Sequence, residues 1–208
     1  EIARRLDLHP STANQLLKTM VDSAHLTFEA VSKTYLPSPR LVRFGGWMVD
    51  TYGGDARLLR LIQQVQSASD EVVTLTTPND IYMQVVDLLG TDFGAADVAG
   101  AERGLRVSMF GSAIGAAYLS TLPDKEILRL ADRARVPASE HEAVLKRIAR
   151  IRQEGYADGP SSHGSIWSLA APLPGKDLTV PLVLGLAGPV ERVRNHLPEL
   201  GALLWKCI

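Results

Sequence analysis

The sequence predicts an α+β fold in two parts, and three patterns carry this prediction. Residues 1–38 contain two short helical repeats of apolar residues, followed by a strand-like alternation. Residues 39–53 form one apolar helical segment, which predicts a linker helix. From residue 54 to residue 208, period-two and helical patterns alternate, which predicts an antiparallel sheet flanked by helices.

Two short helices are predicted at the start of the chain. Apolar residues recur at helical spacing over residues 1–6, and a turn at 7–10 breaks the pattern. Residues 11–24 predict a second amphipathic helix, capped by Ser11 or Thr12. Two helices joined by a tight turn form a helix-turn-helix unit, whose second helix can lie in the major groove of DNA.

A hairpin and a domain boundary follow the second helix. Residues 26–28 and 34–36 alternate as strands do, around a polar turn at 29–33. Helix, turn, helix and hairpin together predict a winged helix. Residues 40–52 are too apolar for an exposed helix, so we expect this helix to link the two parts and to pack against a second subunit. Gly53 marks the boundary.

The larger part predicts a sheet with several helices. We expect strands near 72–77, 81–88, 105–109, 166–171 and 180–187, and helices near 55–68, 111–121, 124–134, 139–154 and 190–205. Pro78, Asn79 and Asp80 predict the turn of a hairpin between the first two strands. Mostly antiparallel strands flanked by helices predict an α+β sensor-like domain.

Composition narrows the function classes. No apolar run approaches the roughly 20 residues that span a bilayer, and the start has no signal-peptide pattern. The chain begins as a helix already under way, so we expect residues before Glu1. The single cysteine, Cys207, allows neither an internal disulfide nor a cysteine zinc site. We expect a cytoplasmic protein with no membrane partner, no cofactor and no metal.

The charges are spread unevenly along the chain. Residues 1–44 carry six lysines and arginines against four acids, whereas the remainder carries 16 against 19. The overall net charge is only −1. This distribution permits a DNA-binding N-terminal part but argues against indiscriminate binding of nucleic acid.

Two stretches of the N-terminal part resemble the IclR family of bacterial transcriptional regulators. Residues 11–17, Ser-Thr-Ala-Asn-Gln-Leu-Leu, are similar to the family's recognition helix, Ser-Thr-x-x-Arg-Leu-Leu, with Gln15 where arginine is usual. Residues 35–41, Tyr-Leu-Pro-Ser-Pro-Arg-Leu, are similar to the end of its wing and the start of its linker helix. The departure at Gln15 leaves the fold prediction intact and bears on the operator sequence.

The resemblance continues in order through the larger part. Residues 112–119 resemble the family's Ser-x-x-Gly-Lys-Ala-x-Leu, with Ala116 in place of lysine. Residues 152–158, followed by 166–172, give the most specific match. Residues 185–189, Gly-Leu-Ala-Gly-Pro, match the family's Ser-x-Ser-Gly-Pro. The ordered set covers essentially the whole chain.

The resemblance implies a fold, a function and partners. It implies a GAF-like effector domain that holds a small molecule between the sheet and the loop before the helix at Ser112. It also implies a double-stranded DNA operator with two-fold symmetry, a homodimer or dimer of dimers, and no enzymatic activity. In this interpretation 1–38 is the DNA-binding domain, 39–53 the linker helix and 54–208 the effector domain.

The recognition helix offers candidates for DNA contact. Asparagine and glutamine can pair bidentately with adenine, so Asn14 and Gln15 are candidates for base reading. The alternative is a capping box of Thr12 and Gln15 that touches no base. The candidates for phosphate contact are Ser11, Thr12, Lys18, Thr19, Lys33 in the wing, Arg4 and Arg5. For the last three, a solvated surface charge is the alternative.

The effector candidates come from the resemblance. The family's contacts carry over to the backbone amides of Ala113 and Ile114, to Asp158 or its neighbour Gly159, and to Ser168, and two family serines fall on Gly185 and Ala187. Amides at a helix start suit a carboxylate, which favours a small organic acid. The two missing hydroxyls predict a roomier, less polar pocket, which favours an aromatic acid.

Some of these candidates have alternative roles. Asp158 would repel a bound carboxylate, so we expect it to contact a ligand hydroxyl instead, or Gly159 to take its place. Met109, Phe110, Ile114 and Trp167 are candidates for the apolar walls, with membership of the core as the alternative for each.

Other function classes have weaker support. Residues 111–115 have the wrong spacing for a nucleophile elbow, and neither a P-loop nor a dinucleotide-binding pattern occurs. His163 with Ser112 could mimic part of a catalytic triad, but we expect a solvated loop histidine there. A small-molecule sensor without sequence-specific DNA binding is the remaining alternative.

Overall fold

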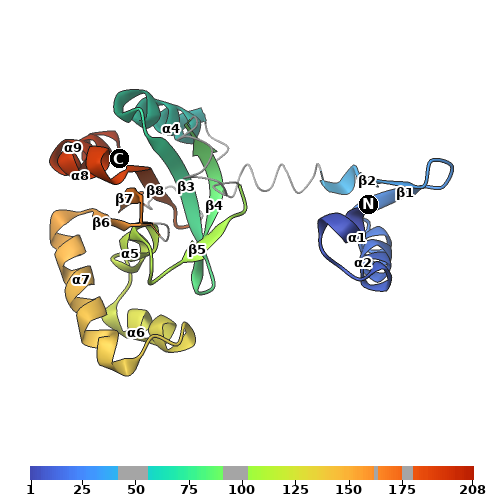
Figure 1. Cartoon of the computed structure of the whole chain (residues 1–208), viewed down its shortest axis with the longest axis horizontal. Coiled ribbons are helices and arrows are strands. Elements are labelled where there is room, and N and C mark those ends of the chain that lie inside the picture. Colours follow the sequence, from blue (N-terminus) through green and yellow to red (C-terminus); the bar gives the residue numbers. More distant parts are fainter. Residues whose placement is uncertain (42–55, 91–102, 162–163, 175–179) are drawn as a thin grey trace. The chain divides into compact units, whose positions relative to one another are not determined.

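The computed structural model describes residues 1–41, 56–90, 103–161, 164–174 and 180–208. The chain divides into two compact units, Glu1–Gly54 and Asp55–Ile208 (Figure 1). The predicted linker helix at 39–53 lies outside the described residues apart from its first three positions. In the described ranges no helix combines the length and apolar character that crossing a membrane requires.

The first unit has the predicted order of helix, helix and hairpin. Helix α1 spans Ile2–Arg5, α2 spans Pro10–Asp22, and strands β1, Leu26–Glu29, and β2, Thr34–Pro37, form an antiparallel pair. The hairpin register runs from Leu26 opposite Pro37 to Glu29 opposite Thr34. The predictions of two helices and a wing are therefore confirmed.

The start of α2 differs from the prediction. The helix begins at Pro10, whose fixed φ suits the first helical position. His9 is the N-cap, and its Nδ1 accepts a hydrogen bond from the Ser11 backbone N–H at 3.4 Å. The prediction of a cap at Ser11 or Thr12 is wrong, because both lie inside the first turn. The alternative of a capping box with Gln15 is excluded for the same reason.

The second unit is a six-stranded antiparallel sheet with helices on both faces. Its elements are α4 (Ala56–Ser69), β3 (Val72–Asn79), β4 (Tyr82–Leu89), β5 (Arg106–Ser108), α5 (Ala113–Leu119), α6 (Asp124–Arg133), the 3-10 turn η1 (Ala138–Glu140), α7 (His141–Glu154), β6 (Ala157–Pro160), β7 (Ile166–Pro172), β8 (Val183–Pro189), α8 (Val190–Asn195) and α9 (Leu197–Cys207). The strand order is β5-β4-β3-β8-β7-β6. The predicted α+β class is confirmed.

Each face of the sheet covers its own core cluster. Helices α4, α8 and α9 pack on one face, called here the α9 face, and α5 and α7 pack on the other, the α5 face (Figure 1). Along β7, Leu169 belongs to the α9-face cluster and Ala170 to the α5-face cluster. Successive strand residues point to opposite faces, so this alternation assigns each strand residue to one cluster.

Two elements of the second unit differ from the prediction. No strand is predicted at β6, where Gly159 and Pro160 disfavour a strand, yet an edge strand tolerates both. The single helix predicted at 190–205 is two helices that meet at His196. Pro198, in the first turn of α9, cannot continue a helix from α8, because it lacks the N–H that the preceding turn requires.

The hairpin between β3 and β4 turns later than predicted. Pro78 and Asn79 belong to β3, and the turn falls at Asp80, which has a φ of 57°. A proline is acceptable at this point because the pairing of β3 with β8 ends at Thr76, so no bond to that neighbour is lost.

Candidate functional site

The polar residues of α2 form an exposed surface. All six α2 residues assigned to DNA contact are exposed, namely Ser11, Thr12, Asn14, Gln15, Lys18 and Thr19. Two of their hydroxyls are used locally, since the Ser11 Oγ lies 2.8 Å from His9 Nδ1 and the Thr19 Oγ1 donates to the Gln15 carbonyl at 3.0 Å.

The side chains of Asn14, Gln15 and Lys18 in α2 are available for an external partner. Among the described residues, none hydrogen-bonds to the side chain of Asn14, Gln15 or Lys18. Asn14 and Lys18 are four positions apart, so they share one face of the helix. This face presents two amide side chains beside one positive charge.

The wing is held in shape by its own turn. The Glu29 carboxylate accepts backbone hydrogen bonds from Val31 at 3.0 Å and from Ser32 at 2.6 Å. Hydrogen bonds from the Ser32 side chain, the Ser32 backbone and the Val31 backbone hold the pKa of Glu29 below its usual range. The exposed Lys33, with a φ of 54°, follows directly, so the wing presents a positive charge from an ordered turn.

Several effector candidates meet on the α5 face of the sheet. Ser168 lies opposite Ala187 in the pairing of β7 with β8, and Gly185 lies opposite Thr74 in the pairing of β8 with β3. A β-carbon at Gly185 would lie 2.6 Å from Thr74 Oγ1 and 3.1 Å from Ile114 Cγ1. The extra room predicted from the missing serine at Gly185 is therefore absent, because these two side chains fill it.

The residues around the start of α5 are mostly core. Met109 and Ala113 are buried within the α5-face cluster, and Phe110 and Ile114 are half-buried against it. Ser112 caps α5, and its Oγ accepts from the Gly115 N–H at 3.0 Å. The first-turn amides of Ala113 and Ile114 have no partner within the helix, as expected for a helix start.

Asp158 and Trp167 belong to a different surface. The Trp167 indole Nε1 donates to Asp158 Oδ2 at 3.1 Å. The Trp167 ring packs against the α9-face cluster, and the Arg194 guanidinium lies 4.8 Å from the ring centroid. Because Trp167 and Ser168 are consecutive strand residues, their side chains point to opposite faces. The predicted effector residues are thus divided between two regions.

A cavity of about 370 Å³ lies at the outer edge of β6, beside α7. Its lining residues are Gly111, Arg147, Arg150, Asp158, Gly159, Pro160 and Trp167. Asp158 and Trp167 were among the predicted site residues, whereas the two arginines were not. The two arginines lie three positions apart in a predicted helix, but β6, the strand that they face, was not predicted. The sequence therefore offered no reason to place them in a site.

Charge is concentrated in this cavity. Arg147 Nη2 donates to the Asp158 backbone carbonyl at 3.3 Å, and Arg150 Nη2 lies 3.4 Å from Asp158 Oδ1. Burial lowers the pKa of Arg147, the nearby Asp158 carboxylate raises it, and the neighbouring Arg150 charge lowers it again. Arginine stays protonated through such shifts, so two guanidinium charges and the Asp158 carboxylate line the cavity, which leaves a net positive charge.

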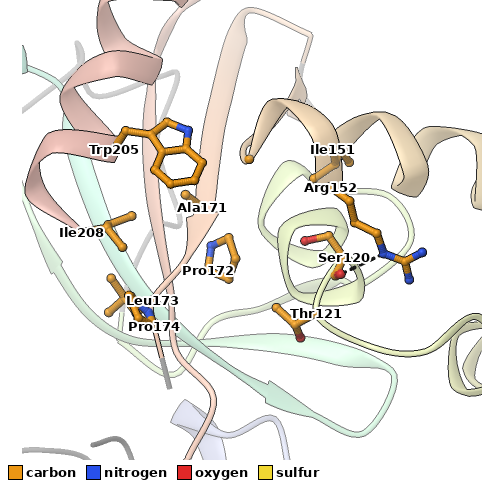
Figure 2. Close-up of a pocket in the computed structure, with 11 residues that line it drawn as sticks. Ser120, Thr121, Ile151, Arg152, Ala171, Pro172, Leu173, Pro174, Trp205 and Ile208 are labelled. Carbon is orange, nitrogen blue, oxygen red and sulfur yellow. Dashed lines mark hydrogen bonds between the residues drawn. The ribbon is translucent and has the colours of Figure 1, made fainter. Parts of the chain in front are cut away.

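A second cavity, of about 420 Å³, lies at the other end of α5. Figure 2 shows Trp205 and Ile208 on one side, Ser120, Thr121 and Arg152 on the other, and Ala171 and Pro172 between them. Each of the three guanidinium nitrogens of Arg152 donates a hydrogen bond, to Asp124 Oδ1 at 2.8 Å and to the carbonyls of Ser120 and Leu122. This cavity therefore offers an apolar surface without a charged group free for a ligand.

The described residues do not bring metal ligands together, and Ser112 has a structural role. Within the ranges that the structure describes, no group of three or more His, Cys, Asp or Glu side chains could hold a metal ion. The hydroxyl of Ser112 donates to the Ser108 carbonyl at 2.7 Å and caps α5, which is a structural role. His163, the other member of the weighed triad, lies outside the described residues.

A helix-turn-helix with a wing, together with a domain that has ligand-sized cavities, defines the class of ligand-responsive transcriptional regulators. Residues 56–207 match the family described as Bacterial transcriptional regulator IclR C-terminal. The match covers well over half of the chain, so the chain belongs to the IclR family. It is an IclR-type transcriptional regulator with an effector-binding domain, and the family is not enzymatic.

Solved structures show the same fold. An IclR family transcriptional regulator from Brucella abortus is 21% identical and covers 99% of this chain and 80% of its own, with a TM-score of 0.68. The Thermotoga maritima IclR is 14% identical, covers 99% and 85%, and has a TM-score of 0.67. An IclR-type regulator from Alicyclobacillus acidocaldarius is 20% identical, covers 99% and 88%, and has a TM-score of 0.64. None of the curated proteins compared with the chain matches it.

Proposed function

We propose that a small organic acid controls the binding of this regulator to double-stranded operator DNA. In this proposal residues 1–38 bind DNA, 39–53 form the linker helix, and 54–208 bind the acid. The protein acts as a homodimer or a dimer of dimers, because an operator with two-fold symmetry requires two recognition helices.

The exposed face of α2 supports the DNA-binding part of the proposal. Asn14 and Gln15 are exposed, and no described residue hydrogen-bonds to their side chains, so their amides are available to base edges. Lys18 on the same face is suited to a phosphate, as is Lys33 in the wing. Ser11, Thr12 and Thr19 are exposed in the same helix and suit the phosphate backbone.

The choice of an acid rests on one observation, the pair of arginines in the cavity at β6. Arg147 and Arg150 give a net positive charge to the cavity, because Asp158 pairs with Arg150 alone, and the volume of the cavity suits a small ligand. The Asp158 carboxylate is engaged by Arg150 and by the Trp167 indole, which removes the repulsion expected between Asp158 and a bound acid. Trp167 also supplies an aromatic wall, which favours an aromatic acid.

The α5 face remains part of the proposed effector region. Gly111, which lines the cavity, lies two positions before the first residue of α5. The amides of Ala113 and Ile114 therefore belong to the same end of the sheet. We propose that Ser168, Ala187 and Gly185, together with Met109 and Phe110, contribute to the effector region and respond when the ligand binds.

Asn14→Ala tests the DNA-binding part. We expect it to reduce discrimination at one base pair per half-site by about 1–3 kcal/mol, because a bidentate contact is lost. The assay is fluorescence anisotropy on an operator selected from a random duplex library, with each base pair then varied. Lys18→Ala is the matched control, and it should weaken all sequences alike and reduce the salt slope by about 1.

Other outcomes would change the assignment. Uniform weakening by Asn14→Ala would mean that Asn14 contacts phosphate or serves the structure. Binding that does not weaken as salt rises, or an absence of binding in the full-length protein, would favour a sensor that does not bind specific DNA. Operator affinity that no acid changes would contradict control by an acid.

A further inference from the structure

The arginines in the cavity at β6 differ in their partners. Arg150 lies 3.4 Å from Asp158 Oδ1 and 3.5 Å from Glu154 Oε2, so two carboxylates neutralise it. Arg147 donates its hydrogen bond to a neutral acceptor, the Asp158 carbonyl, and the Asp158 carboxylate acts on its charge only from a longer distance. Within the described part of the chain no carboxylate lies within 4.0 Å of Arg147.

A half-buried charge is unfavourable when no direct ion pair compensates it. Water is partly excluded from Arg147, which is half-buried, so its charge is less well solvated than that of a surface arginine. A bound anion would compensate this charge, and its oxygen atoms could accept two parallel hydrogen bonds from the guanidinium. The charge distribution therefore favours a carboxylate over a neutral ligand.

The surroundings of Arg147 leave space for such a ligand. Two glycines line the cavity, and a β-carbon at Gly159 would lie 3.4 Å from Arg147 Nη2. The absence of a side chain there keeps the guanidinium accessible. Pro160 and Trp167 form an apolar wall across which the body of an acid could lie.

We infer that Arg147 binds the carboxylate of the effector, in the cavity between α7 and the outer edge of β6. This inference rests on the proposed function, because it assumes that the effector is an organic acid. It assigns the acid group to a side chain of α7 rather than to the amides at the start of α5. Arg150 and Asp158 act as positioning residues that hold the cavity wall.

The experiment compares Arg147→Met with Lys146→Met in the full-length protein. Lys146 is the adjacent α7 residue, and its exposed charge pairs with Glu142 at 2.8 Å, so the control removes an equal charge outside the cavity. The probes are benzoate, phenylacetate and pyruvate, with benzamide as the neutral analogue of benzoate and inorganic phosphate as a non-carboxylate anion. Binding is measured by calorimetry and by the shift in thermal unfolding.

We expect at least one of the acids to bind the wild type, and neither benzamide nor phosphate to bind. Arg147→Met should raise the dissociation constant of that acid at least about tenfold, as expected for a lost charged hydrogen bond, and Lys146→Met should leave it unchanged. Arg147→Lys serves if the methionine variant does not fold. Lysine keeps the charge but cannot donate two parallel hydrogen bonds, so the affinity of this variant for the acid should lie between those of the wild type and Arg147→Met.

Three results would overturn the inference in distinguishable ways. An acid that binds Arg147→Met as tightly as wild type would refute the role of Arg147 while leaving the acid effector intact. An equal loss in Lys146→Met would show a general charge effect instead of a contact. A wild type that binds none of the acids, or binds phosphate alone, would contradict the proposed acid effector and the inference with it.

Discussion

The cross-strand pair of Thr74 and Gly185 sets how closely α5 lies on the sheet, and Gly185→Ala tests this. The new β-carbon would lie 2.6 Å from Thr74 Oγ1, a separation that real side chains do not adopt. Thr74 is buried and β-branched, so its hydroxyl cannot easily turn aside. Ile114 closes the other side at 3.1 Å.

The expected magnitude follows from two opposing effects. Overpacking a close-fitting site costs about 1–3 kcal/mol, whereas replacing glycine by alanine in a strand gains about 0.5–1 kcal/mol. We therefore expect Gly185→Ala to lower the free energy of unfolding by about 1–2 kcal/mol. Thr74→Ala removes the clashing hydroxyl and leaves a space that the new methyl group can fill.

The assay is a double-mutant cycle measured by urea unfolding. The variant carrying both Gly185→Ala and Thr74→Ala should be more stable than the sum of the single effects predicts, with a coupling of about 0.5–3 kcal/mol. Thr77→Ala is the control partner. It lies three residues along β3, about 10 Å away, so its effect should simply add to that of Gly185→Ala. Additive effects for Thr74 and Gly185 would refute the claim that these side chains compete for one space.

Two further predictions concern groups outside the proposed sites. Arg192→Met should destabilise the protein by about 3 kcal/mol, because Glu71 is only 2% exposed and would lose the guanidinium that donates to it at 2.7 Å. Arg129→Met, at an exposed ion pair, should change stability by no more than about 0.5 kcal/mol, and equal losses in urea unfolding would contradict this. Gly155→Ala should cost at least about 1–2 kcal/mol, because Gly155 has a φ of 79° and a β-carbon would lie 1.9 Å from the Trp205 ring. In a variant that also carries Trp205→Ala, only the stability lost through the clash with the ring should be recovered, as measured by thermal unfolding. Recovery of the full stability would mean that alanine at position 155 does not strain the backbone.

Local patterns in the sequence predicted most of the fold. The periodicity of apolar residues located the two N-terminal helices and, among the described residues, seven of the eight strands, the two of the wing included. The exception, β6, contains Gly159 and Pro160. It forms because β7, the next strand along the chain, pairs with it, and this pairing leaves no signal in the four residues of β6 themselves.

The candidate site was predicted in part. The resemblance to the IclR family identified Asp158 or its neighbour Gly159, and Trp167 was a candidate for an apolar wall. All three line a cavity. The resemblance did not identify Arg147 or Arg150, because arginines on the polar side of an amphipathic helix are usually exposed to solvent and do not indicate a site. Nor could it show that Ile114 fills the space above Gly185, since that contact joins a helix to a strand about 70 residues away.

The sequence by itself determined the class of fold, the order of elements and the exposed amide face of α2, because these depend on spacing within single segments. The tertiary structure decided which charges share a cavity and which face of the sheet each strand residue occupies. Burial and charge pairing depend on contacts between separate segments, such as the ion pair between Glu71 and Arg192 or the contact of α7 with its neighbour β6. Only the folded chain therefore shows that Arg147 is half-buried and, among the described residues, forms no direct ion pair.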